Sequence, residues 1–189
     1  FQTDVGTLAR GIVGAGVKME YILFDDCYMS SVEVAYELKE ATRFLIASTS
    51  EMMAYGMPYA IVGEFLLGNP DYGSLCEGFH DFYSTYEMMP CGTLAVTDCS
   101  ELDNMAAIMK SINDRYVFDY SLQGELQGLD GYTPVIFYDF ADYVLTLCSD
   151  PVLTARFREQ LERLVPYKPH TSKFYSRAKG TFPYVLFRG

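Results

Sequence analysis

The chain has 189 residues, half of them hydrophobic, which is enough for one well-packed core and excludes an intrinsically disordered protein. Its 14 basic and 25 acidic residues give a net charge of −11, the wrong sign for a protein that coats the phosphate backbone of nucleic acids. No apolar run approaches the roughly 20 residues of a membrane-spanning helix, so no membrane span is expected.

The first third of the chain has the pattern of a parallel α/β unit. Apolar residues recur at helical spacing over 5–13, after a capping residue at Thr3 or Asp4. An apolar run at 18–24 reads as a buried strand, a capping-box sequence then opens a helix that extends to about Glu40, and 43–48 reads as a second strand. Helix, strand, helix and strand in this order predict parallel strands with helices on the faces of the sheet.

The remaining two thirds predict further helices and three strand-like runs. The segments 51–58 and 119–133 contain glycines, have no clear period and are expected to be loops. The apolar spacing predicts helices at 59–67, 72–88, 100–116, 139–149 and 151–164. Strand-like runs are expected at 92–97, 165–176 and 182–187.

Cys27 stands where the first predicted strand ends, in the sequence ILFDDCYMSS. Ligands of open α/β sheets bind outside the carboxyl ends of the strands, so a thiol here is well placed for chemistry. Because side chains alternate along an extended segment, Asp25 is expected on the same side as Cys27, and Asp26 on the other. Neighbouring carboxylates disfavour a thiolate and cannot activate this thiol. The alternative is a buried structural cysteine beside turn-forming aspartates.

The other cysteines lie in predicted helices or strands and are expected to be inert buried thiols: Cys76, Cys91, Cys99 and Cys148. No CxxC pair and no cysteine–histidine cluster at zinc spacing is present, so neither a disulfide framework nor a metal site is expected. No glycine-rich phosphate-binding loop follows a strand, which disfavours a nucleotide-binding domain.

The stretch DDCYMSSVEVAYELKEATRFLIASTSEMMAYGMPY resembles the region around the nucleophile of the clostripain family of cysteine peptidases. That region reads Asp-Ala-Cys, a hydrophobic residue, Met and two small residues, then Glu-Val-Ala-Tyr-Glu-Leu, Ala-Ser and a Gly-x-Pro-Tyr loop. The resemblance extends from Leu8 to about Tyr59, and more loosely from Tyr138 to Tyr175; Asp26 departs from the usual alanine.

This resemblance implies an α/β fold of the caspase-hemoglobinase type, related to gingipain. We expect a largely parallel sheet flanked by helices, with a helical and strand extension in the C-terminal half. Residues 1–189 are then one peptidase domain fragment. Its catalytic α/β core is expected in residues 1–68, with the helices and strands of 69–189 packed on that core.

The same resemblance implies a cysteine endopeptidase that cleaves after Arg or Lys through an acyl-enzyme. Cys27 is the implied nucleophile, its N–H group one donor of the oxyanion hole, and Asp25 the base of the S1 pocket. Ser48 and Glu51 follow the next parallel strand, so they are expected to line the same cleft, with ordinary loop capping as the alternative. The second functional hypothesis is an inactive relative that binds basic peptides in an acidic cleft.

A cysteine peptidase also needs a histidine beside the thiol. In the resembled family this histidine precedes the cysteine and is followed by glycine, and the family often cleaves itself between the two. Neither His80, within a predicted helix, nor His170, in a predicted surface strand, has this position.

With its abrupt start at Phe1, the chain is therefore expected to be a heavy chain or a fragment of one. The expected partners are an upstream light chain or segment that carries the histidine, and peptides or proteins with Arg or Lys. No cofactor is expected to be required, with calcium left open. The expected location is outside a bacterial cell, by secretion, in the periplasm or at the cell surface.

Overall fold

The computed structural model describes residues 3–183 of the protein. Its α-helices are α1 (Val5–Gly14), α2 (Val32–Leu38), α3 (Tyr59–Val62), α4 (Tyr72–Thr85), α5 (Leu102–Asn113), α6 (Phe140–Leu147) and α7 (Pro151–Leu164). The 3-10 helices are η1 (Gly63–Leu66), η2 (Cys99–Glu101) and η3 (Tyr120–Glu125). The strands are β1 (Met19–Leu23), β2 (Thr42–Ala47), β3 (Ala95–Asp98), β4 (Lys173–Ser176) and β5 (Gly180–Pro183).

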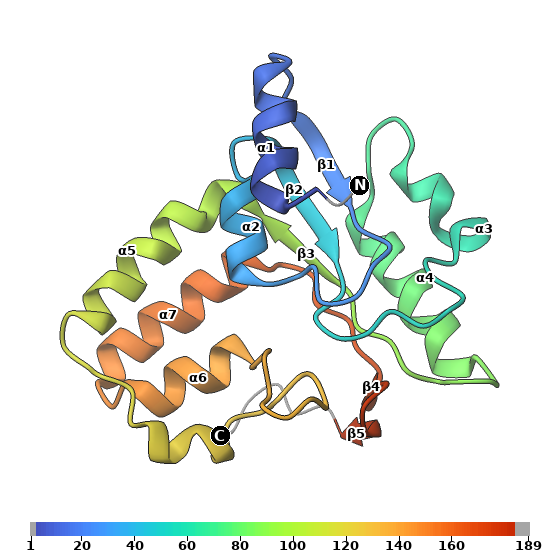
Figure 1. Cartoon of the computed structure of the whole chain (residues 1–189). Coiled ribbons are helices and arrows are strands. Elements are labelled where there is room, and N and C mark those ends of the chain that lie inside the picture. The colour runs from blue at the N-terminus through green and yellow to red at the C-terminus, as the bar shows by residue number, and fades with distance from the viewer. Residues whose placement is uncertain (1–2, 184–189) are drawn as a thin grey trace.

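A three-stranded sheet in the order β1-β2-β3 forms the centre of the fold, and helices flank it (Figure 1). A two-stranded antiparallel sheet, β4-β5, lies at the end of the molecule away from α1. This arrangement confirms the predicted α/β class with a helical and strand extension in the C-terminal half. Within the described residues, no helix is long and apolar enough to cross a bilayer.

The predicted parallel unit is present in α1, β1, α2 and β2. The carboxylate of Asp4 and the hydroxyl of Ser31 accept hydrogen bonds from main-chain N–H groups in the first turns of α1 and α2, which fixes where these helices begin. β1 and β2 pair in parallel up to Leu23 and Ile46. Both strands therefore end at the same edge of the sheet.

The third strand runs in the opposite direction, so the described sheet is mixed. Ala95, at the start of β3, pairs with Ala47, at the end of β2. After α3 and α4 the chain re-enters the sheet at the edge where β1 and β2 end, and this point of entry reverses the direction of β3. The largely parallel arrangement expected from the sequence holds for β1 and β2 only.

Several predicted boundaries also differ from the structure. The helix expected at 59–67 is a short α-helix followed by a 3-10 helix, and the expected loop 119–133 contains η3. Of the strand-like run 165–176, only the end is regular strand; its earlier part forms isolated bridges, Val96 with Tyr167 and Thr93 with His170. The run expected at 182–187 overlaps β5, and 184–187 lies outside the described residues.

Two groups of buried apolar side chains pack on opposite faces of the sheet. Leu45 and Ala47 belong to the group that includes α1, α2, α5, α6 and α7, whereas Ile46 belongs to the group that includes α3 and α4. The alternation along β2 therefore supplies both cores. The C-terminal helices pack on the N-terminal unit in this way, while the division of the chain near residue 68 stays a prediction.

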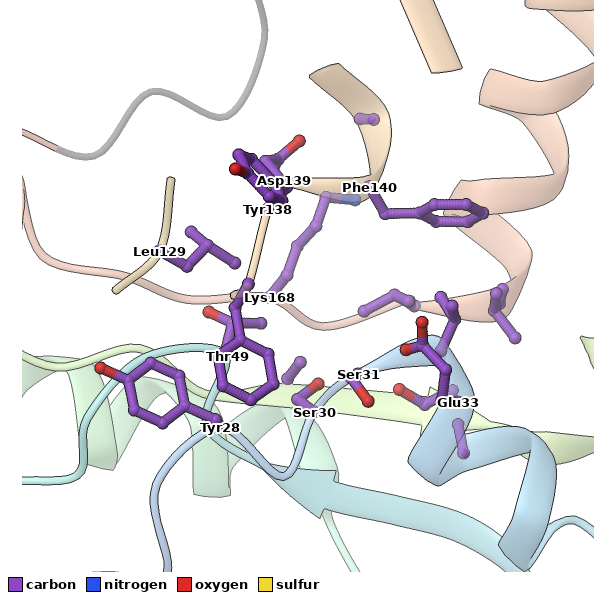
Figure 2. Close-up of a pocket in the computed structure, with 18 of the residues that line it drawn as sticks. Tyr28, Ser30, Ser31, Glu33, Thr49, Leu129, Tyr138, Asp139, Phe140 and Lys168 are labelled. Carbon is purple, nitrogen blue, oxygen red and sulfur yellow. The ribbon is translucent and has the colours of Figure 1, made fainter. Parts of the chain in front are cut away.

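A cavity of about 500 Å³ lies between α2, α6 and α7, and most of its lining is apolar (Figure 2). In Figure 2, Tyr138 and Asp139 lie on one side of this cavity, and Tyr28 and Ser31 lie on the other. Tyr28 directly follows Cys27 in the chain, but Cys27 itself is not part of the lining. The cavity is therefore a neighbour of the thiol and not its cleft.

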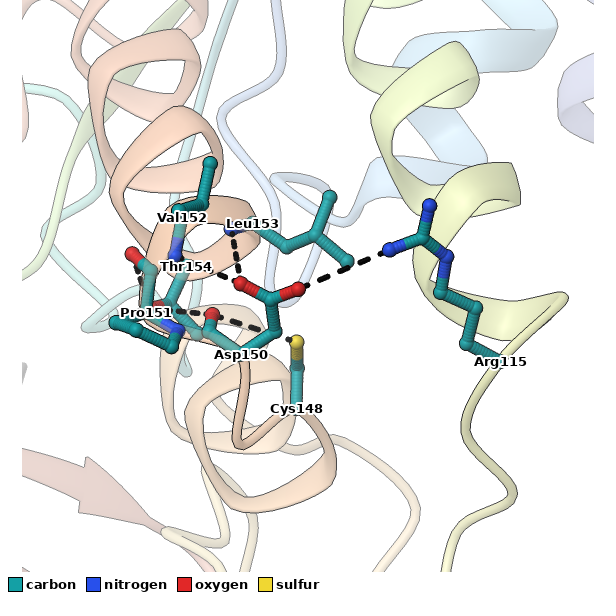
Figure 3. A network of polar contacts seen from close by, with 7 residues as sticks. All are labelled: Arg115, Cys148, Asp150, Pro151, Val152, Leu153 and Thr154. Atoms are coloured by element: carbon teal, nitrogen blue, oxygen red, sulfur yellow. Dashed lines mark hydrogen bonds and ion pairs between the residues drawn. The ribbon is translucent and has the colours of Figure 1, made fainter.

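Asp150 fixes the corner between α6 and α7 (Figure 3). Its carboxylate accepts hydrogen bonds from the N–H groups of Val152 and Leu153, at 2.8 and 3.2 Å. Its second oxygen lies 3.7 Å from the guanidinium group of Arg115, just beyond α5. Asp150 therefore caps α7 directly before Pro151, and it also ties α7 to the end of α5.

Candidate active site

Cys27 lies just beyond the carboxyl end of β1, as the sequence predicts. Main-chain pairing with the neighbouring strand continues past this end. The N–H group of Tyr28 donates to the carbonyl of Ser50 and that of Ser30 to the carbonyl of Ser48, both at 3.0 Å. The thiol is therefore held against the segment that follows β2, on a rigid part of the sheet edge.

The Cys27 thiol is half-buried and has a main-chain donor. The N–H group of Met52 points at the sulfur across 3.3 Å, and the sulfur lies 3.8 Å from the carbonyl oxygen of Met52. Burial raises the pKa of the thiol, the charges of Glu51 and Asp26 add to this, and the Met52 N–H group opposes it. The other four cysteines are free and buried, so Cys27 is the accessible thiol of the five.

The N–H group of Cys27, predicted as an oxyanion donor, already has an acceptor. It donates to Oδ1 of Asp26 at 2.8 Å, and the Asp26 side chain is exposed. An oxyanion at this N–H group has to displace the carboxylate of Asp26. The residue that departs from the family pattern is therefore in contact with the predicted oxyanion donor.

Asp25 faces the same loop as Cys27, residues 51–58. Its Oδ1 accepts a hydrogen bond from the N–H group of Met57 at 2.9 Å. The hydroxyl group of Tyr59 is a further hydrogen-bond partner; burial first, and then the charge and hydrogen bond of Asp25, raise the pKa of Tyr59. Asp25 remains exposed, so its carboxylate is accessible to a cation from solvent.

Ser48 lies in a buried cluster of hydroxyl groups. It has no exposed surface, and its hydroxyl group contacts the carbonyl of Ser50 at 3.0 Å and Oγ1 of Thr93 at 2.8 Å. Thr93 also contacts the hydroxyl groups of Thr49 and Ser50, at 3.1 and 2.9 Å. In this structure Ser48 thus supports the loop after β2 from within, which matches the loop-capping alternative, and its place in S1 stays a prediction.

Glu51 is half-buried and joins three segments. Its Oε1 accepts from the N–H group of Arg177 at 2.7 Å and from the hydroxyl group of Tyr28 at 3.3 Å. Tyr28 has a left-handed backbone, with φ of 59°, and its ring stacks on Phe137 with centroids 4.7 Å apart. Glu51 therefore helps to fix Tyr28, the residue after Cys27, and its contact with substrate stays a prediction.

Neither histidine is a hydrogen-bond partner of the thiol, whose bonds within the described chain are both with Met52. His80 lies on α4, with Nε2 3.2 Å from the hydroxyl group of Ser84 and Nδ1 3.5 Å from the carboxylate of Asp81. His170 has Nδ1 2.8 Å from the carbonyl of Thr171. Among the residues that the structure places, no group of three or more His, Cys, Asp or Glu is arranged to hold a metal ion.

Sequence reasoning missed several residues of this site. The contacts of Tyr28, Thr93 and Met52 join segments that are far apart in the chain and leave no local pattern. Gly56 was visible only as part of the Gly-x-Pro-Tyr loop, although a side chain at this position would collide with the carboxylate of Asp25.

Comparison with known proteins identifies the family. The model of the clostripain family matches residues 7–153, and no curated protein matches the chain. A solved clostripain from Bacteroides thetaiotaomicron ATCC 29148, in complex with the peptide inhibitor BTN-VLTK-AOMK, is 64% identical with a TM-score of 0.95, over 97% of this chain and 82% of that one.

Two further solved structures are longer than this chain. The secreted C11 cysteine protease "iotapain" of Bacteroides thetaiotaomicron is 64% identical with a TM-score of 0.95, over 97% of this chain and 52% of its own. An inactive zymogen C11 protease from Parabacteroides distasonis is 29% identical with a TM-score of 0.82, over 96% of this chain and 53% of its own. The chain thus spans about half of these two proteins. The family match over most of its length and the shared fold show that the chain belongs to the clostripain family of cysteine proteases.

Proposed function

We propose that this chain supplies the nucleophile and the S1 pocket of a cysteine endopeptidase that cleaves after Lys or Arg. One observation carries the proposal: the accessible thiol, Cys27, and the exposed carboxylate of Asp25 contact the same loop at the edge where β1 and β2 end. The peptide inhibitor of the 64% identical clostripain has lysine directly before its AOMK group, which supports a basic P1 residue.

In the proposed mechanism, the thiolate of Cys27 attacks the carbonyl carbon of the scissile peptide bond. The carbonyl oxygen becomes an oxyanion and takes over the Cys27 N–H group from Asp26. Collapse of this intermediate breaks the C–N bond; the amine leaves with a proton from the general acid, and the acyl group remains on the sulfur. Water then hydrolyses the thioester, which releases the acid and restores the thiol.

The N–H group of Met52 has a distinct part in this mechanism. It donates to the sulfur and therefore favours the thiolate, against the burial that raises the pKa of Cys27. The carboxylate of Asp25 pairs with the ammonium or guanidinium group of the P1 side chain. Together these two contacts prepare the thiol and place the substrate.

The general base is proposed to come from an upstream light chain or segment. In the described structure β1 pairs with β2 alone, so the other side of β1 is open to pairing with a further strand. A strand that paired there in parallel would have its carboxyl end beside those of β1 and β2, close to Cys27, where a histidine is needed. The zymogen form of the Parabacteroides relative supports activation by processing, which we extend to self-cleavage in this protein.

The same relatives support a proposal for where the enzyme is located. One of them is described as secreted, which supports an extracellular location for this protein, with the periplasm and the cell surface as narrower options. No cofactor is needed for the chemistry above, and calcium is left open.

The second candidate is an inactive relative that binds basic peptides in its acidic cleft. The carboxylate of Asp26 on the Cys27 N–H group and the raised pKa of the thiol favour it, because both oppose catalysis. Steady-state hydrolysis of Lys and Arg reporter peptides by the complete mature protein and by Cys27→Ala separates the two. The peptidase predicts turnover that Cys27→Ala abolishes; the inactive relative predicts binding without turnover in either protein.

A further inference from the structure

One peptide group links the carboxylate of Asp25 to a tyrosine on another element. The N–H group between Gly56 and Met57 donates to Oδ1 of Asp25 at 2.9 Å. The carbonyl of this same peptide group, that of Gly56, accepts a hydrogen bond from the hydroxyl group of Tyr83 on α4 at 2.6 Å. Because the peptide group is planar and rigid, whatever orients its carbonyl also orients its N–H group.

Gly56 lets the carboxylate lie directly against this peptide group. A Cβ atom at position 56 would stand 2.7 Å from Oδ2 and 2.9 Å from Oδ1 of Asp25, closer than carbon and oxygen atoms approach. The φ angle of Gly56 is +73°, a conformation that residues with a side chain rarely adopt. Both properties require glycine here, and both serve the contact with Asp25.

Tyr83 holds the carbonyl of Gly56 from a fixed position in the core. Its side chain is completely buried, and its ring packs against Phe79 and Phe82, with centroids 4.8 and 5.0 Å apart. Burial, and after it the charge of Asp25, raises the pKa of the Tyr83 phenol, so the hydroxyl group stays protonated and remains a donor. A buried donor of fixed position restricts the loop 51–58 at the residue that contacts Asp25.

We propose that Tyr83 is a positioning residue for the S1 pocket: it holds the 56–57 peptide group, whose N–H group fixes one oxygen of Asp25 and leaves the carboxylate turned toward the cation of the P1 side chain. The inference rests on the proposed function, which assigns Asp25 to S1. Hydrogen bonds in a chain strengthen one another, so the Tyr83 hydroxyl group also strengthens the bond from Met57 to Asp25. Tyr83 thereby sets selectivity for a charged side chain without touching the substrate.

The test measures binding separately from catalysis, in the complete mature protein with Cys27→Ala. Isothermal titration gives the dissociation constants of two peptides that differ only in a C-terminal lysine or its uncharged analogue norleucine. Tyr83→Phe, which removes only the hydroxyl group, is then added. It is expected to raise the dissociation constant of the lysine peptide about three- to tenfold and to leave that of the norleucine peptide unchanged. Tyr86→Phe is the matched control, because Tyr86 packs in the same aromatic cluster, and it is expected to change neither constant.

A purely structural role for Tyr83 predicts that both peptides weaken equally; that result, or an unchanged lysine constant, overturns the inference. If Tyr83→Phe does not fold, as judged by circular dichroism, Gly56→Ala tests the same peptide group and is expected to remove the lysine preference. Retained preference in a folded Gly56→Ala protein overturns the inference. Equal binding of lysine and norleucine peptides before any change at Tyr83 instead refutes the S1 assignment of the proposed function.

Discussion

The main-chain N–H group of Cys27 donates a hydrogen bond to the carboxylate of Asp26, with 2.8 Å between the nitrogen and Oδ1. Asp26 thus occupies, with its own negative charge, the place where the proposed mechanism requires an oxyanion. The same charge adds to the burial that raises the pKa of the Cys27 thiol. Both effects act against catalysis, and both depend on a side chain that is exposed and has no place in the core.

Replacing Asp26 with alanine is therefore expected to increase activity. The oxyanion no longer competes for the Cys27 N–H group, and we expect kcat/KM on a lysine reporter to rise about three- to tenfold. Asp26→Asn keeps an acceptor oxygen but loses the charge, so it is expected to fall between wild type and Asp26→Ala. A decrease in kcat/KM for a folded Asp26→Ala protein means that Asp26 assists catalysis.

Replacing Asp25 with asparagine is expected to remove the preference for basic residues. The amide oxygen can still accept from the N–H group of Met57, so the loop keeps its contact while the charge is lost. The loss of a charged partner typically costs about 2–5 kcal/mol, or roughly 30- to 5000-fold in kcat/KM for Lys and Arg substrates. Norleucine reporters serve as the control and are expected to change little; unchanged kinetics on Lys and Arg reporters would place the S1 carboxylate elsewhere.

His80 and His170 are expected to be dispensable for catalysis. Each has a structural partner, Ser84 for His80 and the main chain of Thr171 for His170. Replacement of either by glutamine is expected to leave turnover within a few-fold of wild type. A general base typically raises the rate of the reaction by a factor of ~10²–10⁴. A loss of turnover of that size in folded His170→Gln protein would therefore place the base within this chain.

A feature of the fold could be predicted from the sequence where its signal is local, that is, where it depends on residues close together in the chain. The cap before α1 and the apolar runs of β1 and β2 are local signals. The structure contains both strands and uses Asp4, one of the two predicted caps, whereas the cap of α2 is Ser31, one residue after the first serine of the capping-box sequence. The direction of β3 is not local, because it depends on the edge at which the chain returns to the sheet after α4. The sequence therefore predicted the strand but not its antiparallel pairing.

The same distinction applies to the site. The place of Cys27 beyond a strand end follows from the apolar run before it. Residues 26–28 form a bend and a turn, so the contact of Asp25 and Cys27 with one loop does not result from strand alternation. Ser48 was expected at the cleft, which stays a prediction. Its contact with Thr93 in a buried cluster of hydroxyl groups could not be predicted, because Thr93 comes from a segment 45 residues away. The hydrogen bond from Tyr83 to Gly56 likewise spans 27 residues, and no pattern in the sequence marks it.

The raised pKa of Asp139 predicts how the stability of the protein depends on pH. This buried residue caps α6, and burial, with the charge of Asp142 in addition, raises its pKa from 3.8 to about 6. The folded state thus holds the proton more tightly than the unfolded state. The stabilisation from this residue is complete below pH 3.8 and is lost as the pH rises through about 6.

Asp139→Asn keeps a capping oxygen without the charge. It is expected to stabilise the protein by about 1–3 kcal/mol at neutral pH and to flatten the pH profile above pH ~4. Urea unfolding at several pH values measures both effects. Lower stability of Asp139→Asn at neutral pH, with no change in the profile, would show that the Asp139 carboxylate is charged and well paired in the folded protein.

The central claim is that Cys27 is the nucleophile of the complete mature protein, in which an upstream light chain or segment supplies the general base. The most direct test is to treat the complete mature protein with a peptidyl electrophile that carries Lys or Arg at P1, and to map the modified cysteine by mass spectrometry. We predict rapid labelling of Cys27 alone among the five cysteines, slowed by Asp25→Asn and absent in Cys27→Ala. Labelling of Cys27 no faster than that of a buried cysteine such as Cys76, or undiminished hydrolysis by Cys27→Ala, would contradict this account.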